Sequence, residues 1–203
     1  MASQEEGKKP NKSFLRFVLS LVVYAVGAIL LMGGLLVLIW LGRPYFALYL
    51  SPQKKVLEEK VRLDKVKGDR LIIPSILVDA EIVEGATKVN LRRGVAHVSG
   101  STYPGAKGNT IVEGHNYVQF GGDQAFFSLL HKIKEGAPIH VYFEGKKYHY
   151  RVAGKKILKV SNPNLYQITT SERLTLITCA SDFSSLSMIS PTERIVVTAK
   201  SSR

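Results

Sequence analysis

The chain has 203 residues, with 28 lysine or arginine residues against 16 aspartate or glutamate residues and a formal net charge of +12. This length suits one domain of ordinary size with an appendage, and the positive charge suits an anionic neighbourhood such as phosphate-rich polymer, lipid head groups or nucleic acid. A single cysteine excludes an intrachain disulfide and the paired-cysteine zinc sites. We expect no metal ion and no cofactor.

The N-terminal part of the chain predicts a membrane anchor. Residues 1–16 form a polar, mainly basic tail, and residues 17–42 contain no charged residue. As a helix, residues 17–42 would extend about 39 Å, enough to cross a hydrocarbon core of about 30 Å. The segment lacks the polar face of a core helix and the nearby cleavage site of a signal peptide. We expect a single transmembrane helix at 17–42, with the N-terminus cytoplasmic and residues 43–203 outside the cytoplasm.

The rest of the chain predicts a stalk and a mainly β domain. Residues 43–69 carry a weak amphipathic pattern, which favours a linker or a short helix. From residue 70, short β-rich runs alternate with Gly, Pro, Asn and Asp, which is typical of a sandwich or a closed barrel. The domains are therefore expected at 1–16, 17–42, 43–69 and 70–203.

Individual elements follow from the same patterns. A hairpin turn is expected at Glu144-Gly145 between two strands. Apolar residues at helical spacing predict a helix at 123–133, and a short helical turn is expected near 89–94. We expect strands at 71–73, 80–83, 110–114, 139–143, 147–158, 174–179 and 195–199.

A candidate nucleophile ends one of these strands. The run Leu174-Thr175-Leu176-Ile177-Thr178 leads directly to Cys179, and a thiol at a strand end is held by the sheet while it still meets solvent. The competing interpretation is an ordinary buried cysteine. Thiols of exported proteins are usually bridged, so a free thiol in an exported domain favours a reactive role.

A cysteine nucleophile needs a proton-transfer partner. His115 follows the β-run 110–114 and opens a loop that contains two further glycines, so it mirrors Cys179 in its place at a strand end. His97 is the second candidate. The remaining histidines, His131, His140 and His149, lie within the expected helix and the expected hairpin.

Acyl chemistry also needs a donor to the developing oxyanion. Arg194 begins the last predicted strand, fifteen residues after Cys179. If the two strands pair antiparallel, both side chains lie at one end of the sheet. A guanidinium keeps its charge at physiological pH and presents a fork of donors, but a surface arginine is common in a basic protein.

These residues resemble the sortases, the membrane-anchored cysteine transpeptidases of mainly Gram-positive cell surfaces. The resemblance is carried by Gly114-His115, Thr175-Leu176-Ile177-Thr178-Cys179 and Arg194 in that order, and it covers roughly residues 70–200. It implies a mainly β fold, a closed eight-stranded sortase-type β-barrel with one or two short helices, preceded by the N-terminal transmembrane helix.

The resemblance also implies roles for these residues. Cys179 would attack a C-terminal sorting signal of the Leu-Pro-x-Thr-Gly kind and form a thioester. His115 would transfer the protons, Arg194 would hold the substrate backbone or the oxyanion, and Thr178 would line the signal pocket. The partners would be surface proteins that carry the signal and an amine from a cell-wall precursor or a pilin.

Several absences bear on the subtype and on the alternatives. The chain ends at Arg203 directly after the last predicted strand and shows no aspartate-aromatic lid motif, which favours a housekeeping class A-like or a class D-like enzyme. The alternative is a membrane-tethered basic β-barrel that binds anionic cell-wall polymer and has a structural cysteine. Nucleic-acid binding is disfavoured because the domain is expected outside the cytoplasm.

Overall fold

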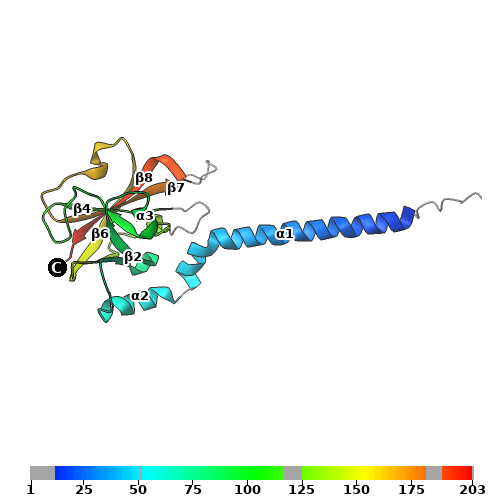
Figure 1. The fold of residues 1–203 in the computed structure, drawn as a ribbon, viewed down its shortest axis with the longest axis horizontal. Coiled ribbons are helices and arrows are strands. Elements are labelled where there is room, and N and C mark those ends of the chain that lie inside the picture. The colour runs from blue at the N-terminus through cyan, green and yellow to red at the C-terminus, as the bar shows by residue number, and fades with distance from the viewer. Residues whose placement is uncertain (1–11, 51, 117–124, 182–188, 203) are drawn as a thin grey trace, which may run out of the picture. The chain divides into compact units, whose positions relative to one another are not determined.

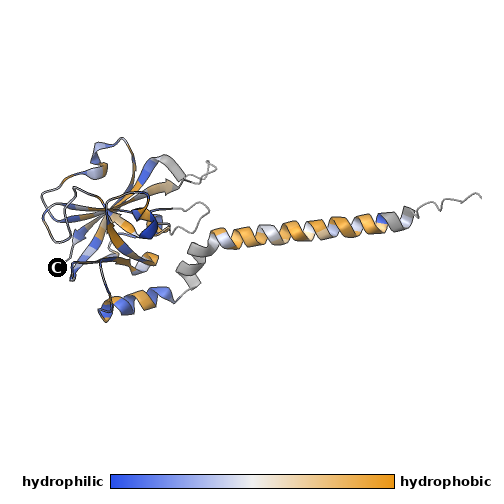
Figure 2. Cartoon of the chain, in the orientation of Figure 1, coloured by the Kyte–Doolittle hydropathy of each residue, from blue (hydrophilic) through white to orange (hydrophobic). Residues whose placement is uncertain are grey.

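The computed structural model describes residues 12–50, 52–116, 125–181 and 189–202. The chain divides into two units, residues 1–43 and residues 44–203. The N-terminal helix α1 (Lys12–Leu50) contains the window Arg16–Gly42, whose mean hydropathy is 2.7 and which is long and apolar enough to cross a membrane by length and composition. Figure 2 shows apolar residues along this window. The helix runs past the predicted end at residue 42, into the segment expected to be a stalk.

A second helix, α2 (Gln53–Arg62), follows in the same predicted stalk segment. Leu57 and Val61 are buried on one side of α2 and pack against Ile72 and Tyr142 of the β domain. These apolar contacts make α2 part of the surface of the folded domain. A solvated linker, one of the two expectations for this region, is therefore wrong for residues 53–62.

The folded domain is a closed barrel of eight strands in the order β1-β2-β3-β4-β7-β8-β6-β5, with β5 pairing β1. Figure 1 shows this mainly β domain as a ribbon. The β2–β3 and β4–β7 pairs are parallel and the others are antiparallel. The predicted eight-stranded barrel is confirmed. The strands are β1 (Arg70–Ile73), β2 (Val78–Glu84), β3 (Val95–His97), β4 (Asn109–Glu113), β5 (Pro138–Phe143), β6 (Lys146–Lys159), β7 (Arg173–Ser181) and β8 (Ile189–Ser201).

Apolar side chains cover both faces of β7. Leu174 and Leu176 point into the main core of the barrel. Ile177 belongs instead to a second cluster on the outer face, with Ile111, Val196 and Leu165. Leu165 lies in the 3-10 helix η3 (Pro163–Tyr166), which therefore packs on the outside of the sheet at β4, β7 and β8. This two-sided packing fixes the strand that carries the cysteine.

The local predictions were mostly correct. Each of the predicted strands overlaps an observed one, and the hairpin at Glu144-Gly145 is confirmed by positive φ values of 49° and 72° and by the pairing of Phe143 with Lys146. A short helix, α3 (Asn90–Arg93), lies where a helical turn was expected. Strand β3 was not predicted, because three residues give too short a pattern.

The predicted helix at 123–133 is wrong for the residues that the structure describes. Residues 126–129 form turns, and η2 (Leu130–Lys132) is a 3-10 helix. Residues 123 and 124 lie outside the described residues. The spacing of Phe127, Leu129, Leu130 and Ile133 reflects burial, because all of these side chains enter the barrel core from an irregular segment.

Candidate active site

The parallel pairing of β4 with β7 brings the His115 and Cys179 positions side by side. Glu113 pairs with Ile177 in this ladder. The last bond of this pairing runs from the backbone N–H of Gly114 to the carbonyl oxygen of Ile177 at 3.1 Å. His115 is the next residue of its chain and stands in the row of Cys179, two residues after Ile177.

The antiparallel pairing of β7 with β8 adds Arg194 to the same row, because Cys179 and Arg194 are direct partners in that ladder. The expected antiparallel pairing of the cysteine and arginine strands is confirmed. Directly opposed residues of neighbouring strands present their side chains to the same face. His115, Cys179 and Arg194 are all half-buried, so none of them is sealed inside the barrel.

The thiol lies on the outer face of the barrel. Side chains alternate along a strand, and Cys179 shares its face with Thr175 and Ile177 rather than with Leu174 and Leu176, which fill the core. An ordinary core position for the cysteine is thereby excluded. The sheet holds its backbone, while the side chain meets the outer surface.

Three contacts fix the turn that carries His115. Gly114 lies against the ring of Phe127, where an added Cβ would come within 2.6 Å of Cδ2, so only glycine fits without movement. The hydroxyl of Thr178 donates to the carbonyl oxygen of Gly114 at 2.7 Å. The backbone N–H of Phe127 donates to the carbonyl oxygen of His115 at 2.9 Å. The backbone is therefore held both at Gly114, just before the histidine, and at His115 itself.

Thr178 was expected to line the signal pocket. Its side chain is on the opposite face of β7 from the thiol of Cys179, and the residue is only 2% exposed. Its hydroxyl is engaged with Gly114. The structure thus places Thr178 behind the thiol, where it supports the turn before His115.

Arg194 is held by a backbone contact and lies near the hydrogen-bonded pair of Tyr166 and Glu113. Its Nη1 donates to the carbonyl oxygen of Glu193 at 2.9 Å. The hydroxyl of Tyr166 donates to Oε1 of Glu113 at 2.6 Å. Burial and this bond to Glu113 raise the pKa of Tyr166 to about 12, and the positive charge of Arg194 opposes the rise. Tyr166 therefore stays a neutral donor at physiological pH, within the field of the guanidinium.

Asn116 is a site residue that sequence reasoning missed. Its Nδ2 donates to the carbonyl oxygen of Cys179 at 2.8 Å, and the residue is 7% exposed. The bond ties the loop after His115 to the backbone of the cysteine. Its place directly after His115 was the available signal, but a polar residue in a loop has no pattern that distinguishes it from a solvated one.

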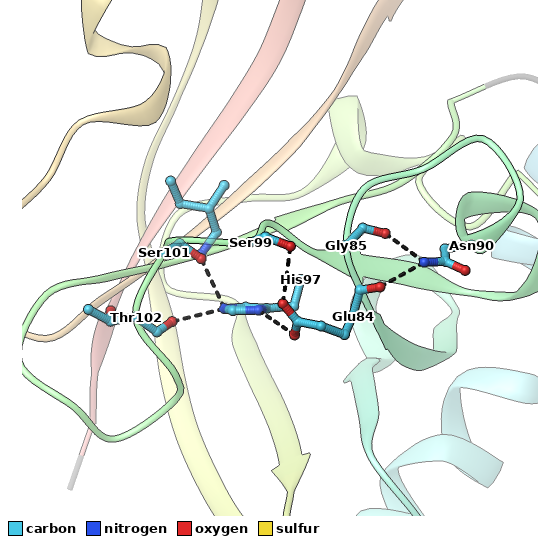
Figure 3. A network of polar contacts seen from close by, with 8 residues as sticks. Glu84, Gly85, Asn90, His97, Ser99, Ser101 and Thr102 are labelled. Atoms are coloured by element: carbon cyan, nitrogen blue, oxygen red, sulfur yellow. Dashed lines mark hydrogen bonds and ion pairs between the residues drawn. The ribbon is translucent and has the colours of Figure 1, made fainter.

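His97, the second candidate for the proton-transfer role, is buried in a different network (Figure 3). Its Nδ1 lies 2.8 Å from Oε2 of Glu84, and its Nε2 lies 3.1 Å from the carbonyl oxygen of Thr102 and 2.9 Å from Oγ of Ser101. A carboxylate only accepts, so Nδ1 donates to Glu84, while Nε2 faces both the Thr102 carbonyl and the Ser101 hydroxyl. Both ring nitrogens of His97 are thus engaged in this network with Glu84, Ser101 and Thr102.

The remaining histidines lie elsewhere. His131 is in η2, and His140 and His149 face each other across β5 and β6, strands that do not pair with β7. Within the described ranges, no group of three or more His, Cys, Asp or Glu side chains is arranged to hold a metal ion. Of the histidines, the row on the outer face includes only His115 in the part of the chain that the structure describes.

Comparison with known proteins points to one family. A family model described as the sortase domain matches residues 71–202. Sortase A of Bacillus anthracis is 30% identical over 112 residues, which are 55% of this chain and 51% of that protein. Sortase D of Bacillus subtilis (strain 168) is 26% identical over 110 residues, or 54% and 52% of the two chains.

A solved structure of the same family has a similar fold. The complex of Streptococcus agalactiae sortase C1 and MTSET has a TM-score of 0.57 at 26% identity, with 66% of this chain and 67% of that chain covered. The aligned part of this chain spans about half the length of the curated relatives.

Proposed function

The chain belongs to the sortase family, whose domain model matches residues 71–202, and on that premise we propose that it is a membrane-anchored cysteine transpeptidase. It cleaves a C-terminal sorting signal of the Leu-Pro-x-Thr-Gly kind and transfers the protein to a cell-surface amine. The observation that carries the proposal is the row of Cys179 and Arg194 on paired strands with His115 just after the neighbouring strand β4, on the outer face of the barrel.

The first half of the reaction forms a thioester. The thiolate of Cys179 attacks the carbonyl carbon of the signal threonine, and the C–N bond to the following glycine breaks. His115, as the imidazolium, gives its proton to the leaving amine. Attack needs the thiolate and departure needs the imidazolium, so the competent pair is the charged one, and its population depends on two coupled titrations.

The second half transfers the acyl group. The acceptor amine attacks the thioester carbonyl, neutral His115 takes the proton from the new ammonium, and the thiolate of Cys179 leaves. A thioester keeps most of the energy of the cleaved amide, so no nucleotide is needed. The acceptor is an amine of a cell-wall precursor or of a pilin, and water is the slower substitute.

Charge on the substrate oxygen needs a fixed donor. Arg194 stands directly opposite Cys179, and the bond from its Nη1 to the carbonyl oxygen of Glu193 orients the guanidinium. Asn116 fixes the carbonyl of Cys179 and so holds the nucleophile against the histidine loop. In this proposal Arg194 stabilises the oxyanion or the substrate backbone, and Asn116 positions the nucleophile.

The outer face also offers room for the substrate. A hollow of about 450 Å³ is lined by Val98, Ile111, Tyr166 and Ile168, among others. Ile111 lies on β4 on the same face as Glu113, four residues before His115. We expect this apolar hollow to receive the side chains that precede the cleaved bond.

The activity test uses the full chain in detergent micelles, a panel of quenched Leu-Pro-x-Thr-Gly peptides and an amine acceptor. Cys179→Ala should abolish cleavage, and His131→Gln, a histidine outside the row, should retain it. Full activity in His115→Ala would move the proton-transfer role to another histidine. Cleavage by Cys179→Ala at the rate of the unmodified protein would overturn the proposal. Absence of cleavage by the unmodified chain on every peptide would favour the polymer-binding alternative, in which the cysteine is structural.

A further inference from the structure

Two histidines outside the proposed active site face each other across the β5–β6 hairpin. His140 and His149 are direct cross-strand partners, and their Nδ1 atoms lie 2.9 Å apart. At this distance one ring donates its Nδ1 hydrogen to the lone pair of the other. The rings are perpendicular, with centroids 5.0 Å apart. The pair plays no part in the proposed transpeptidation.

The nitrogen separation suits two neighbouring ligands of one metal ion. Imidazole nitrogens bind transition metals at about 2.0–2.1 Å. Two such ligands at a right angle are then separated by about 2.9 Å, as in the tetragonal sites of Cu²⁺ and Ni²⁺, and by about 3.4 Å in a tetrahedral zinc site. The observed 2.9 Å is a hydrogen-bonding distance that already brings the two Nδ1 atoms as close as neighbouring ligands of one ion, and rotation about the soft χ2 bonds turns both lone pairs toward one point and readjusts the separation.

The hydrogen bond between the rings requires a lone pair on one Nδ1, which is the form in which imidazole binds a metal. Burial lowers the pKa of His140 to about 4, with the charges of His149, Lys147 and Arg151 adding to the effect. Burial also lowers the pKa of His149. Burial thus favours the uncharged form of both rings, and metal binding needs a shift of the shared hydrogen from Nδ1 to Nε2 of the same ring.

The surroundings leave room for an ion and its water ligands. A surface hollow of about 290 Å³ is lined by both histidines together with Pro138, Arg151 and Ser202, among others. Lys147 and Arg151 repel a cation, but both point to other partners. The amine of Lys147 donates to the carbonyl oxygen of Val61 at 2.9 Å, and Nη1 of Arg151 donates to that of Gly136 at 3.1 Å.

We propose that His140 and His149 form a two-histidine site for a divalent transition metal ion, with Cu²⁺ and Ni²⁺ preferred and water completing the coordination. The expectation of no metal site rested on the single cysteine, and imidazole ligands do not need one. Hard cations such as Mg²⁺ take oxygen ligands and should not bind here.

The experiment is calorimetric titration of the full chain in detergent micelles, in a Cys179→Ala background that removes thiolate binding. Ni²⁺ should bind one ion per chain. His140→Gln and His149→Gln should each weaken binding at least tenfold, whereas the matched control His131→Gln should leave it unchanged. Mg²⁺ should give no binding heat. Cooperative thermal unfolding of each variant checks that it is folded.

A second measurement avoids changes at the pair itself. In the same Cys179→Ala background, Zn²⁺ serves as a diamagnetic probe, and the ring ¹⁵N signals of both histidines should move together to the positions of metal-bound Nδ1 and protonated Nε2. Unchanged Ni²⁺ affinity in the double variant His140→Gln/His149→Gln would overturn the proposal. So would ring signals that do not respond, or no binding up to about 1 mM Ni²⁺.

Discussion

Cys179 and Thr178 are neighbours in the sequence but belong to opposite faces of β7. The thiol meets the outer surface, and the threonine hydroxyl reaches the carbonyl oxygen of Gly114 behind it. Because His115 follows Gly114, this buried bond links the strand of the proposed nucleophile to the turn that carries the proposed base. Thr178 can therefore affect catalysis without contacting substrate.

Thr178→Val tests that role, because it keeps the shape of the side chain and removes the hydroxyl. It leaves the buried Gly114 carbonyl without this donor and should cost about 1–3 kcal/mol in the free energy of unfolding, measured by urea denaturation. We expect kcat to fall with little change in KM for a signal peptide, and Thr178→Ser to restore most of both losses. A raised KM at unchanged kcat and stability would instead assign Thr178 to the substrate pocket.

Arg194→Lys tests whether the several hydrogen-bond donors of the guanidinium are needed beside Cys179. A point charge cannot reproduce a guanidinium, and loss of an oxyanion donor costs about 100–1,000-fold in kcat. We therefore expect kcat/KM for peptide cleavage to fall by about that factor. Arg93→Lys, at an exposed arginine paired with Glu81, is the matched control. Turnover near that of the unmodified chain in Arg194→Lys would remove Arg194 from the mechanism.

At the scale of elements, α2 is held on the barrel by a narrow apolar stripe. Leu57 is 8% exposed and packs near Ile72 and Tyr142, whereas the adjacent Val56 is 59% exposed. Lys60 adds a 2.5 Å ion pair with Asp79 of β2. These contacts predict that α2 unfolds together with the barrel and not as an independent linker.

Substitutions at two neighbouring residues of α2 test whether the helix unfolds with the barrel or as an independent linker. Leu57→Ala removes a buried side chain and should lower the free energy of unfolding by about 2–3 kcal/mol. Val56→Ala, one residue away on the exposed side, should change it by less than about 0.5 kcal/mol. Both values come from urea denaturation of the full chain in micelles. Equal and small effects would mean that α2 does not contribute to the folded domain.

A comparison of the predicted with the observed strands and helices shows how much of the structure the sequence predicts. Short β-rich runs bounded by Gly, Pro, Asn and Asp located most strands, because β-branched and aromatic residues favour strands and the bounding residues favour turns. The prediction from apolar spacing failed at 123–133, where buried side chains of an irregular segment imitate helical spacing. The pairing of the Cys179 strand with the Arg194 strand was predictable from their proximity in the chain.

The remainder of the candidate site depends on long-range pairing. The parallel contact of β4 with β7 joins segments more than sixty residues apart, and no local pattern indicates it. Their places at strand ends indicated Cys179 and His115, and the resemblance added a pocket role for Thr178, whose buried side chain is on the other face of β7 from the thiol. Asn116 and Tyr166 were missed because their partners, the Cys179 carbonyl and Glu113, are distant in sequence.

At the scale of the whole molecule, chemical labelling of the Cys179 thiol tests on which side of the membrane the barrel lies. The chain has a single cysteine, and the apolar window of α1 precedes the barrel in sequence. A short basic tail before a first span usually remains in the cytoplasm. A membrane-impermeant maleimide added to spheroplasts of an expression host should therefore label Cys179 without lysis, and Cys179→Ser should give no signal. Labelling only after lysis would place the barrel in the cytoplasm.

The most direct measurement is the intact mass of the full chain after rapid acid quenching during turnover of a Leu-Pro-x-Thr-Gly peptide. Transpeptidation through Cys179 predicts a mass increase equal to the peptide fragment that ends at threonine. The adduct should map to Cys179, disappear on adding an amine acceptor, and be absent in Cys179→Ala. Peptide cleavage with no adduct at Cys179 under any quenching time, or an adduct at another residue, would contradict the proposed thioester.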